Sequence, residues 1–393
     1  MKKALIILAV FATSISASAQ SFYVDAKNPE MVHASEARDA HRKEIIIPQV
    51  NGFNVYKADL HTHTMYSDGQ VLPKYRIREA WQDGLDIIAV TEHVEYRPVE
   101  ADLVNYLEKY TDKKHKEAVN HRIGGDGTTK DGIMVDLNTA VKISEKLAKS
   151  YGLTVIPGLE ITRDADKIGH FNALFTTDNN LIYDPDPYQS ILNAKAQNAL
   201  IQHNHPGWRR KTLAYSEWQK RVYGEGLVDG VEVVNGDEIY PGIVDRCVKD
   251  GMYITANTDI HATTAADYRV YGNDRPMTLV FAKDKSLESV REALEAQRTL
   301  ALAFNNLWGP DQLLKDLFMA CVKVEQLSGN KYVLTNISSI PFVLQQKGSN
   351  RVHLDPSTSI FMSVPKNGNS LNFAVVNMWN GAESNPDIEI TVK

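Results

Sequence analysis

Histidine and acidic residues stand directly after short apolar runs at several points of this sequence. The stretch KADLHTHTMYSDG, residues 57–69, carries His61 and His63, although the chain has only 12 histidines among 393 residues. Alternate residues of a β-strand point to the same side, so such a pair can hold one ion together. Other residues share this spacing or follow other apolar runs: Asp259 with His261, His203 with His205, and His93 and Glu160. Together they indicate a metal site.

Imidazole and carboxylate groups gathered in one place are typical ligands of Zn²⁺, Mn²⁺ or Fe²⁺. Sulfur ligands are scarce, because the chain has only Cys247 and Cys321, which we interpret as core residues, either free or paired. A divalent ion lowers the pKa of a bound water from about 15.7 to about 7, and a second ion about 3.5–4 Å away stabilises phosphate oxygens. The expected chemistry is hydrolysis by a metal-bound hydroxide.

The elements that position these residues follow from the hydrophobic pattern. From residue 53 onward, short apolar runs rich in β-formers, such as LDIIAVTEH and LTVIPGLEIT, alternate with segments of helical periodicity. Strands that alternate with helices predict parallel β/α units, and seven or eight such units favour a closed or nearly closed barrel. A doubly wound open sheet is the alternative, but the sequence has no glycine-rich dinucleotide fingerprint. The carboxyl ends of barrel strands meet at one face, which would bring the candidate ligands together.

The motifs DLHTHTMYSDG, VTEH, GLEIT, GHFN, HNHPGW and NTDIH occur in the order and spacing of the polymerase and histidinol phosphatase (PHP) domain. The segment of roughly residues 55–305 resembles that family. The resemblance implies a distorted seven-stranded β/α barrel, two to three divalent ions (Mn, Zn or Fe) and hydrolysis of phosphate esters.

The resemblance also implies which residues hold the ions. The first ion would be held by His61, His63, Glu160 and Asp259, the second by Glu160 as a bridge with His170 and His205, and the third by Asp68, His93 and His261. Glu160, His205 and Asp259 are also the candidate catalytic residues. Asp68 stands where some relatives have histidine, which resembles a branch acting on small nucleotide-like monoesters and bisphosphates. VTEH departs from the commoner Thr-Asp-His, so Glu92 is either a partner of a ligand or a solvated acid.

Candidate substrate-binding residues follow predicted strands. Arg209 and Arg210 come directly after His-Pro-Gly-Trp, and a guanidinium can hold a phosphate through two hydrogen bonds. Three other arginines follow predicted strands in the same way: Arg163, Arg269 and Arg275. We expect at least one of the five to contact substrate, with surface salt bridges as the alternative role. His203 is a further candidate, because the resemblance selects His205 as the ligand and leaves His203 extra.

Four segments are predicted from composition and pattern. Residues 1–19 are typical of a signal peptide cleaved after Ala19, with two lysines followed by an apolar run too short to span a membrane. We therefore expect an exported protein, periplasmic or secreted. An N-terminal extension (20–52), the barrel (53–308) and a small all-β, immunoglobulin-like sandwich (309–393) would follow. The polar insert at 97–136 is predicted to be a loop or lid over the barrel mouth.

Loss of the signal peptide removes Lys2 and Lys3 and takes the formal net charge from −6 to −8. This charge argues against a nucleic-acid polymer as partner, since such binders need a broad basic surface. The predicted function is an exported metal-dependent phosphoesterase that acts on a small phosphate ester, nucleotide-like or another monoester. The alternatives are a metal-dependent amidase, ester or carbamate hydrolase of the same fold, and a non-catalytic surface binding protein.

Overall fold

The computed structural model describes residues 22–34, 41–100, 121–123, 133–365 and 368–392, in two compact units, 1–42 and 43–393. Within the first unit, β1 (Phe22–Val24) and β2 (Val32–Ala34) form an antiparallel hairpin. The predicted signal peptide lies outside the described residues. Most of the predicted insert does so too; within it, β5 (His121–Ile123) and β6 (Ile133–Val135) form a hairpin.

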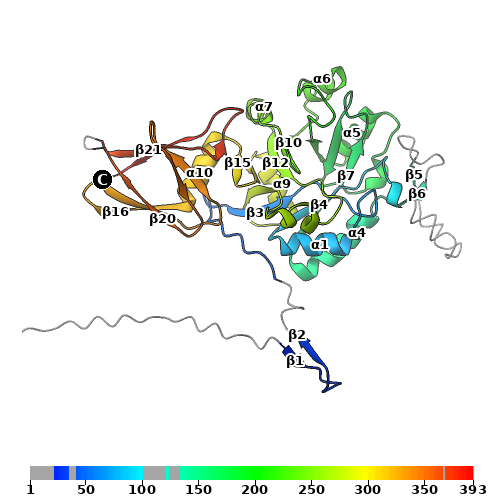
Figure 1. Ribbon diagram of the computed structural model, residues 1–393. Helices are drawn as coiled ribbons and strands as arrows, with labels where there is room; N and C mark the ends of the chain where they lie inside the picture. Colours follow the sequence, from blue (N-terminus) through cyan, green and yellow to red (C-terminus); the bar gives the residue numbers. More distant parts are fainter. Residues whose placement is uncertain (1–21, 35–40, 101–120, 124–132, 366–367, 393) are drawn as a thin grey trace, which may run out of the picture. The chain divides into compact units, whose positions relative to one another are not determined.

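A twelve-stranded sheet dominates the described part of the second unit (Figure 1). Along one path its strands are β11 (Glu238–Ile239), β10 (Gly230–Asn235), β9 (Leu200–Asn204), β8 (His170–Leu174), β7 (Thr154–Thr162), β4 (Ile87–Val90), β3 (Asn54–Asp59), β13 (Met277–Ala282), β14 (Thr299–Ala303), β15 (Asn306–Trp308) and β22 (Met378–Trp379). β12 (Tyr253–Asn257) pairs with β10 outside this path.

The sheet is mixed, which corrects the prediction of parallel units throughout. β3, β4 and β7 pair in parallel, as do β9, β10 and β12. β8, however, is antiparallel to both β7 and β9, and β13 is antiparallel to β3 and β14. The loop 163–169 between β7 and β8 is too short for the crossover that a parallel pair requires, so the two strands form a hairpin.

The sheet curls until β12 approaches β13 and β14. On that side, the N–H groups of Ile254 and Ala256 donate to the hydroxyls of Thr299 and Thr278, at 3.1 and 3.0 Å, in place of a strand ladder. Backbone bonds also join the loops after β3 and β12, from His63 N to Ile260 O (3.2 Å). A curled α/β sheet is therefore confirmed, and the count of seven barrel strands stays a prediction.

Helices connect these strands: α1 (Pro73–Gln82), α4 (Thr139–Ala148), α5 (Pro187–Ala196), α6 (Glu217–Gly224), α7 (Gly242–Asp250), α8 (Thr264–Asp267) and α9 (Leu287–Glu295), with 3-10 turns η1 (Lys149–Tyr151), η2 (Asn179–Leu181) and η3 (Arg269–Tyr271). α1 begins with proline at its first position, and four of its five buried residues recur at helical spacing: Pro73, Arg76, Ile77 and Ala80. None of the described helices is long and apolar enough to cross a membrane.

The C-terminal segment begins with a helix that the sequence pattern did not predict, α10 (Asp311–Cys321). Two all-β sheets follow, as predicted: β16 (Val322–Ser328), β17 (Lys331–Asn336) and β20 (Ser359–Ser363), and β19 (Arg351–Leu354), β18 (Phe342–Gln345), β21 (Ser370–Val375) and β23 (Asp387–Thr391). Their immunoglobulin-like nature stays a prediction.

One hydrophobic core joins the C-terminal segment to the large sheet. It contains residues of β13 and β14, of α10 and of both C-terminal sheets, and includes Leu279, Phe318 and Phe342. Cys321 belongs to it, and both it and Cys247 are free and buried. Burial raises the pKa of the Cys321 thiol to about 11, which leaves it protonated and unreactive at neutral pH. The predicted boundary at residue 308 therefore falls within a continuous core.

Phe318 offers a test of this shared core. Its ring is fully buried and packs edge-on against Phe342 and Phe373, with centroids 5.1 and 5.6 Å away. We expect Phe318→Ala to lower the free energy of unfolding by about 3–5 kcal/mol, because it leaves a cavity. Phe361, which is 70% exposed, is the matched control, and Phe361→Ala should change stability by less than about 0.5 kcal/mol. Equal urea midpoints for the two variants would contradict a shared core.

Candidate metal centre

The structure brings the nine predicted metal ligands together at one edge of the large sheet. Most follow the last residue of a strand: His61 and His63 follow β3, His93 follows β4, His205 follows β9, and Asp259 and His261 follow β12. Glu160 lies near the end of β7, Asp68 lies in the loop before α1, and His170 begins β8. Because β8 runs antiparallel to its neighbours, its first residue lies at the edge where their last residues lie.

Four donor atoms form a first cluster. His61 Nε2 lies 3.1 Å from His63 Nε2 and 3.2 Å from Asp259 Oδ1, and His63 Nε2 lies 3.0 Å from the same oxygen. Glu160 Oε2 lies 3.5 Å from each histidine nitrogen. Tetrahedral ligands about 2.1 Å from one ion lie about 3.4 Å apart, so these separations suit a shared cation.

The Glu160 carboxylate joins this cluster to a second one. Its other oxygen, Oε1, lies 3.2 Å from His170 Nδ1 and 3.6 Å from His205 Nε2. Asp259 spans the same two clusters, because its Oδ2 lies 3.8 Å from His205 Nε2. Each carboxylate thus presents one oxygen to either side, as a bridging ligand does.

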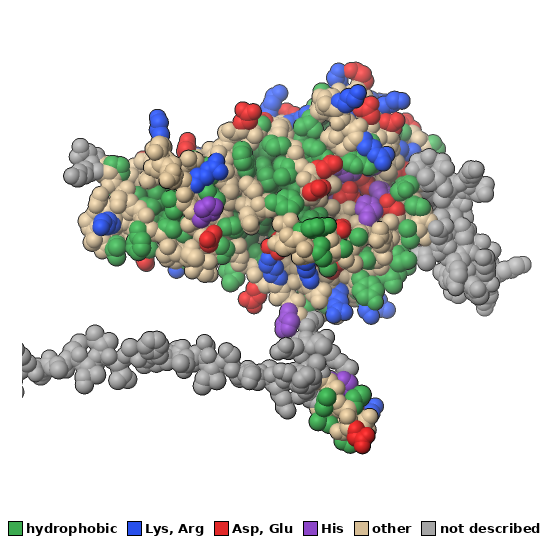
Figure 2. Space-filling model, viewed as in Figure 1, with side chains coloured by type: hydrophobic (Ala, Val, Ile, Leu, Met, Phe, Trp, Pro, Cys, Tyr) green, Lys and Arg blue, Asp and Glu red, His purple; other side chains and the backbone are tan. Residues whose placement is uncertain are grey.

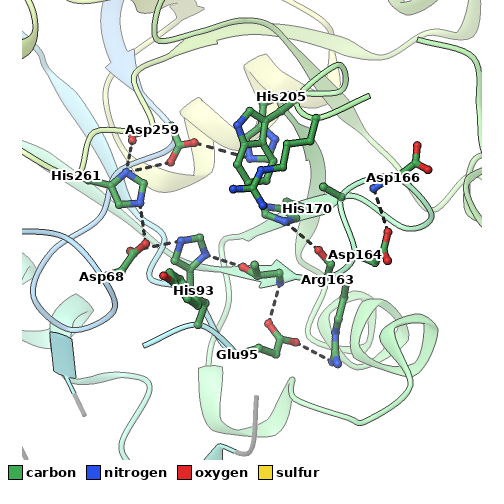
Figure 3. Close-up of a pocket in the computed structure, with 15 residues that line it drawn as sticks. Asp68, His93, Glu95, Arg163, Asp164, Asp166, His170, His205, Asp259 and His261 are labelled. Atoms are coloured by element: carbon green, nitrogen blue, oxygen red, sulfur yellow. Dashed lines mark hydrogen bonds and ion pairs between the residues drawn. The ribbon is translucent and has the colours of Figure 1, made fainter. Parts of the chain in front are cut away.

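A third cluster surrounds Asp68. Its two oxygens lie 3.4 Å from His93 Nε2 and 3.1 Å from His261 Nε2 (Figure 3). The His63 ring stacks between those of His93 and His261, with centroids 4.3 and 4.5 Å away. His63 therefore touches the first and the third cluster.

The hydrogen bonds of the histidines direct their lone pairs into the clusters. His61 Nδ1 donates to Glu232 Oε1 (2.8 Å), and His170 Nε2 donates to the carbonyl oxygen of Arg163 (3.0 Å). A neutral imidazole that donates through one nitrogen accepts through the other, so His61 Nε2 and His170 Nδ1 face carboxylate oxygens without a proton between them. Among the described residues, His170 Nδ1, Glu160 Oε2 and Asp259 Oδ1 have no hydrogen-bond partner of acceptable geometry. Acceptors that face acceptors in a buried site fit divalent cations.

The charges of the site agree with this fit. Burial, together with the charges of His93 and His261, lowers the pKa of His63 to about 3, so its ring is neutral. Burial opposes ionisation of Glu160, but the charges of His93 and His61 outweigh it and hold the pKa of the carboxyl well below its usual range. Without ions, Asp259, Glu232 and Glu160 raise the pKa of His61 against the effect of burial, so a proton supplies the missing charge.

Three residues of this edge have left-handed backbone: His205 (φ 26°), Arg209 (φ 56°) and Asp259 (φ 52°). Such angles are uncommon outside glycine and often mark functional sites. At Asp259 the turn lets the backbone N–H donate to His61 O at 3.0 Å while the carboxylate reaches the clusters. At His205 the turn interrupts the regular alternation of side chains between the two faces of β9.

That turn corrects the prediction that His203 and His205 point to the same side. His203 lies on the opposite face of β9, where its ring stacks on Phe171 (4.6 Å) and its Nδ1 bonds the hydroxyl of Tyr223 (2.7 Å). Burial and the charge on His205 hold the pKa of His203 well below its ordinary value. Asn204 faces the site instead and donates to Glu160 Oε1 at 3.0 Å.

Two of the predicted arginines line the cavity at the metal centre, which has a volume of about 920 Å³. Arg209 is exposed, and its guanidinium lies 4.2 Å from the ring centre of Trp208. Arg163 forms an ion pair with Glu95 at 2.7 Å (Figure 3). Burial raises the pKa of Glu95 to about 7, although the charge of Arg163 acts to lower it. In the space-filling view, histidine and acidic side chains gather in a recess on the visible face (Figure 2).

The other predicted arginines are engaged elsewhere. Arg210 donates to Gln219 Oε1 (3.0 Å) and to Ala214 O (2.7 Å). Arg269 and Arg275 both pair with Asp83, and Arg275 also pairs with the buried Asp59 (2.5 Å). None of the three lines the described cavity at the metal centre, so the expectation that they contact a phosphate there has no geometric support.

Sequence reasoning missed Glu232, which is fully buried at the centre of the site. Five groups donate to its two oxygens: His61 Nδ1, Asn257 Nδ2 (3.0 Å) and Gln202 Nε2 (3.4 Å) to Oε1, and His205 N (2.7 Å) and Asn235 Nδ2 (2.8 Å) to Oε2. In the sequence, the only signal for Glu232 was an acidic residue within the apolar run VDGVEVVNG.

The role of Glu92 was left open by the sequence. In the structure it holds the loop that carries the ligands, because it accepts from Ser67 Oγ (2.5 Å) and Thr64 N (3.1 Å).

Comparisons with known proteins agree with this geometry. The PHP domain family model matches residues 59–237. A two-domain protein from Bacteroides vulgatus ATCC 8482, described as containing a predicted PHP-like metal-dependent phosphoesterase, is 30% identical, with a TM-score of 0.76; the match covers 90% of this chain and 100% of that one. A putative metal-dependent phosphoesterase from Bifidobacterium adolescentis ATCC 15703 is 14% identical, with a TM-score of 0.36, over 52% of this chain and 88% of that one. None of the curated proteins matches significantly.

One comparison corrects an expectation from net charge. A complex of endonuclease Q with a 27-mer duplex is 15% identical, with a TM-score of 0.37, over 66% of this chain and 60% of that one. The expectation that no nucleic-acid polymer is a partner is contradicted by this comparison, in which the similar protein is in complex with a duplex.

The two-domain relative is matched over its whole length at 30% identity, and the nine metal ligands implied by the PHP motifs lie in three adjoining clusters. The chain belongs to the PHP domain family.

Proposed function

We propose that this protein is an exported metal-dependent phosphoesterase that hydrolyses a phosphate monoester. The observation that carries the proposal is the set of buried acceptor atoms that face one another around Glu160, with His61 Nε2 and His63 Nε2 on one side and His170 Nδ1 on the other. Such a set demands cations. The Bacteroides vulgatus protein, described as containing a predicted PHP-like metal-dependent phosphoesterase, supports phosphorus as the site of attack.

The ligand sets would be those implied by the sequence motifs, with Glu160 between the first and second ions. When bound, such ions supply an activated water and neutralise phosphate oxygens. Glu160 and Asp259 would fix the spacing of the ions, because each carboxylate presents its two oxygens to different clusters. His205 lines the cavity beside Asp259 and would contact the bound phosphate or its ion.

Arg209 and Arg163 would orient the ester. Both line the cavity, whose volume of about 920 Å³ suits a small molecule. Arg163 is held by Glu95 Oε1 and by Asp184 O (2.6 Å), so it enters the cavity wall with a fixed position. Arg209 is exposed and less restrained, which suits closure on a bound phosphate.

The activity is tested with purified, Mn²⁺-loaded protein on 4-nitrophenyl phosphate and 4-nitrophenyl acetate, with a duplex oligonucleotide as a third substrate. We expect turnover of the phosphate monoester, loss of turnover with a chelator, and joint loss of metal and turnover in His61→Ala. Faster turnover of the acetate would favour an amidase or carboxylic-ester hydrolase, and faster cleavage of the oligonucleotide would favour a nuclease. A metal-loaded protein inert towards all three substrates would favour a binding protein.

The bridging role separates Glu160 from Asp68. Glu160→Gln keeps the size of the side chain but removes a charge that offsets two cations, whose repulsion is strong in a partly dry site. We expect this variant to lose more than one ion per chain and to lower kcat by about 100-fold or more. The loss of ions would remove both the activated water that attacks the phosphate and the charge that stabilises the phosphate oxygens. Asp68→Asn is the matched control and should lose about one ion and keep measurable turnover. Elemental analysis that finds full metal occupancy in Glu160→Gln would refute the bridge.

Glu232 should act on the metals without touching them. Because all five of its partners donate, a glutamine there must turn its amide N–H₂ toward at least one donor. We expect Glu232→Gln to weaken metal binding by about 10–100-fold. Glu217→Gln, at an exposed position of α6, is the matched control and should bind metal as the wild type does. Unchanged metal dissociation constants in Glu232→Gln would show that the carboxylate does not orient His61 and His205.

A further inference from the structure

A second cavity adjoins the metal centre. It has a volume of about 620 Å³ and shares two lining residues, Trp208 and Asp259, with the cavity at the ions. Asp259 belongs to the first metal cluster, so a molecule held at the ions can extend past this residue into the second cavity. An ester bound with its phosphate on the metals would place its alcohol part there.

The lining of this second cavity differs in charge from that of the first. Its described residues include no lysine, arginine or histidine. Besides Asp259, it has three carboxylates and two amides: Asp237, Glu238, Asp267, Asn235 and Asn273. Carboxylates accept hydrogen bonds from hydroxyl groups and repel further phosphates, whose charge no side chain here would offset.

Aromatic side chains supply the apolar part of the wall: Trp208, Tyr268, Tyr271 and Phe304. Tyr271 is 74% exposed, a large apolar ring that no other described part of the chain covers. Aromatic rings beside a few polar groups are typical of small-molecule sites and cover the C–H face of a ring-shaped ligand.

Phe304 reaches the cavity from a strained position. It lies in the turn between β14 and β15 with φ 47°, and Asn305 follows with φ 60°. Two left-handed residues form the kind of hairpin turn that favours Asn and Gly, so a phenylalanine at the first position costs free energy. A strained aromatic residue at a cavity wall is a candidate for a ligand contact.

The C-terminal segment holds this turn in place. Asn377 is buried; its side-chain Nδ2 donates to Asn305 O (2.8 Å), and its backbone carbonyl oxygen accepts from Leu307 N (3.0 Å). The same side chain donates to Pro341 O and accepts from Val343 N, at 2.8 and 2.9 Å, so it also belongs to the C-terminal sheet region. β15 and β22 continue the contact as a parallel pair.

We propose that the second cavity is the leaving-group subsite of this enzyme and takes an uncharged, hydroxyl-rich ring such as that of a sugar. Phe304 forms its apolar wall, and Asn377 of the C-terminal segment is a positioning residue for Phe304. The inference rests on the proposed function, because it assumes a phosphate at the ions.

The test compares glucose 1-phosphate with glucose 1,6-bisphosphate on Mn²⁺-loaded, full-length protein, beside 4-nitrophenyl phosphate. We expect kcat/KM to be at least about tenfold higher for the monophosphate, because the second phosphate would meet carboxylates. Hydrolysis of 4-nitrophenyl phosphate without this preference would overturn the subsite and leave the proposed function standing. If no ester is hydrolysed, calorimetric titration with the same two sugar phosphates decides the question, and equal dissociation constants overturn the subsite.

Variants assign the roles of the residues. Asparagine tolerates the left-handed conformation, so Phe304→Asn removes the ring and keeps the turn. We expect it to raise KM, or the dissociation constant, for glucose 1-phosphate about tenfold, with metal content unchanged. Asn377→Ala should raise the same constant and leave kcat within about twofold, a split that a general loss of folded protein would not give. Phe361→Ala, on the exposed face of β20, is the control and should change neither constant. Wild-type constants in Phe304→Asn would overturn the role of the ring.

Discussion

Buried carboxylates that face unprotonated imidazole nitrogens are unstable unless cations join them, and this constraint governs the edge of the sheet where the ligands meet. Glu160 is fully buried, and the donor atoms nearest its oxygens belong largely to histidines that are already directed by other hydrogen bonds. A charge without a partner costs several kcal/mol in such a place. When no metal is bound, protons on His61, His93 and His205 supply part of the positive charge that the buried carboxylates need. Neighbouring acids raise the pKa of each of these histidines against the effect of burial.

Two buried arginines hold the loops that carry the metal ligands in place, although the carboxylates in these loops repel one another. Arg76, on α1, donates to the carbonyl oxygens of His63 (2.9 Å) and Ile260 (3.0 Å), and so joins the loop after β3 to the loop after β12. Arg275 makes the same connection from the other side through Asp59, whose Oδ1 accepts from His61 N (3.1 Å) and from Thr258 N (3.2 Å). Loops about 200 residues apart in sequence are thus fixed by cations of the protein before any metal binds.

The ligands could be predicted from sequence because their motifs combine a residue type with a local geometry. His61 and His63 follow a strand in regular alternation, and the structure places them as expected. His203 and His205 have the same spacing, but the left-handed turn at His205 sends the two rings to opposite faces. Arg275 follows a predicted strand as Arg209 does, yet it is buried against Asp59. Neither difference is visible without the three-dimensional neighbours. Likewise Glu232 is one more acid in the sequence, and only the convergence of five donors identifies its role.

The C-terminal segment illustrates how an appended β-structure can affect a site that it does not enter. Its residues share a core with β13 and β14, and Asn377 holds the turn that carries Phe304. The nine candidate metal ligands all precede residue 262, so none of them lies in the C-terminal segment. Changes in that segment would act on the wall of the second cavity through the strained hairpin turn that carries Phe304. Because different parts of the chain position the metal ligands and the wall of the proposed leaving-group subsite, substrate preference can change while the metal centre stays the same. The shared core makes this coupling rigid, because a displacement of β22 would have to open buried contacts of β15 before it moved Phe304.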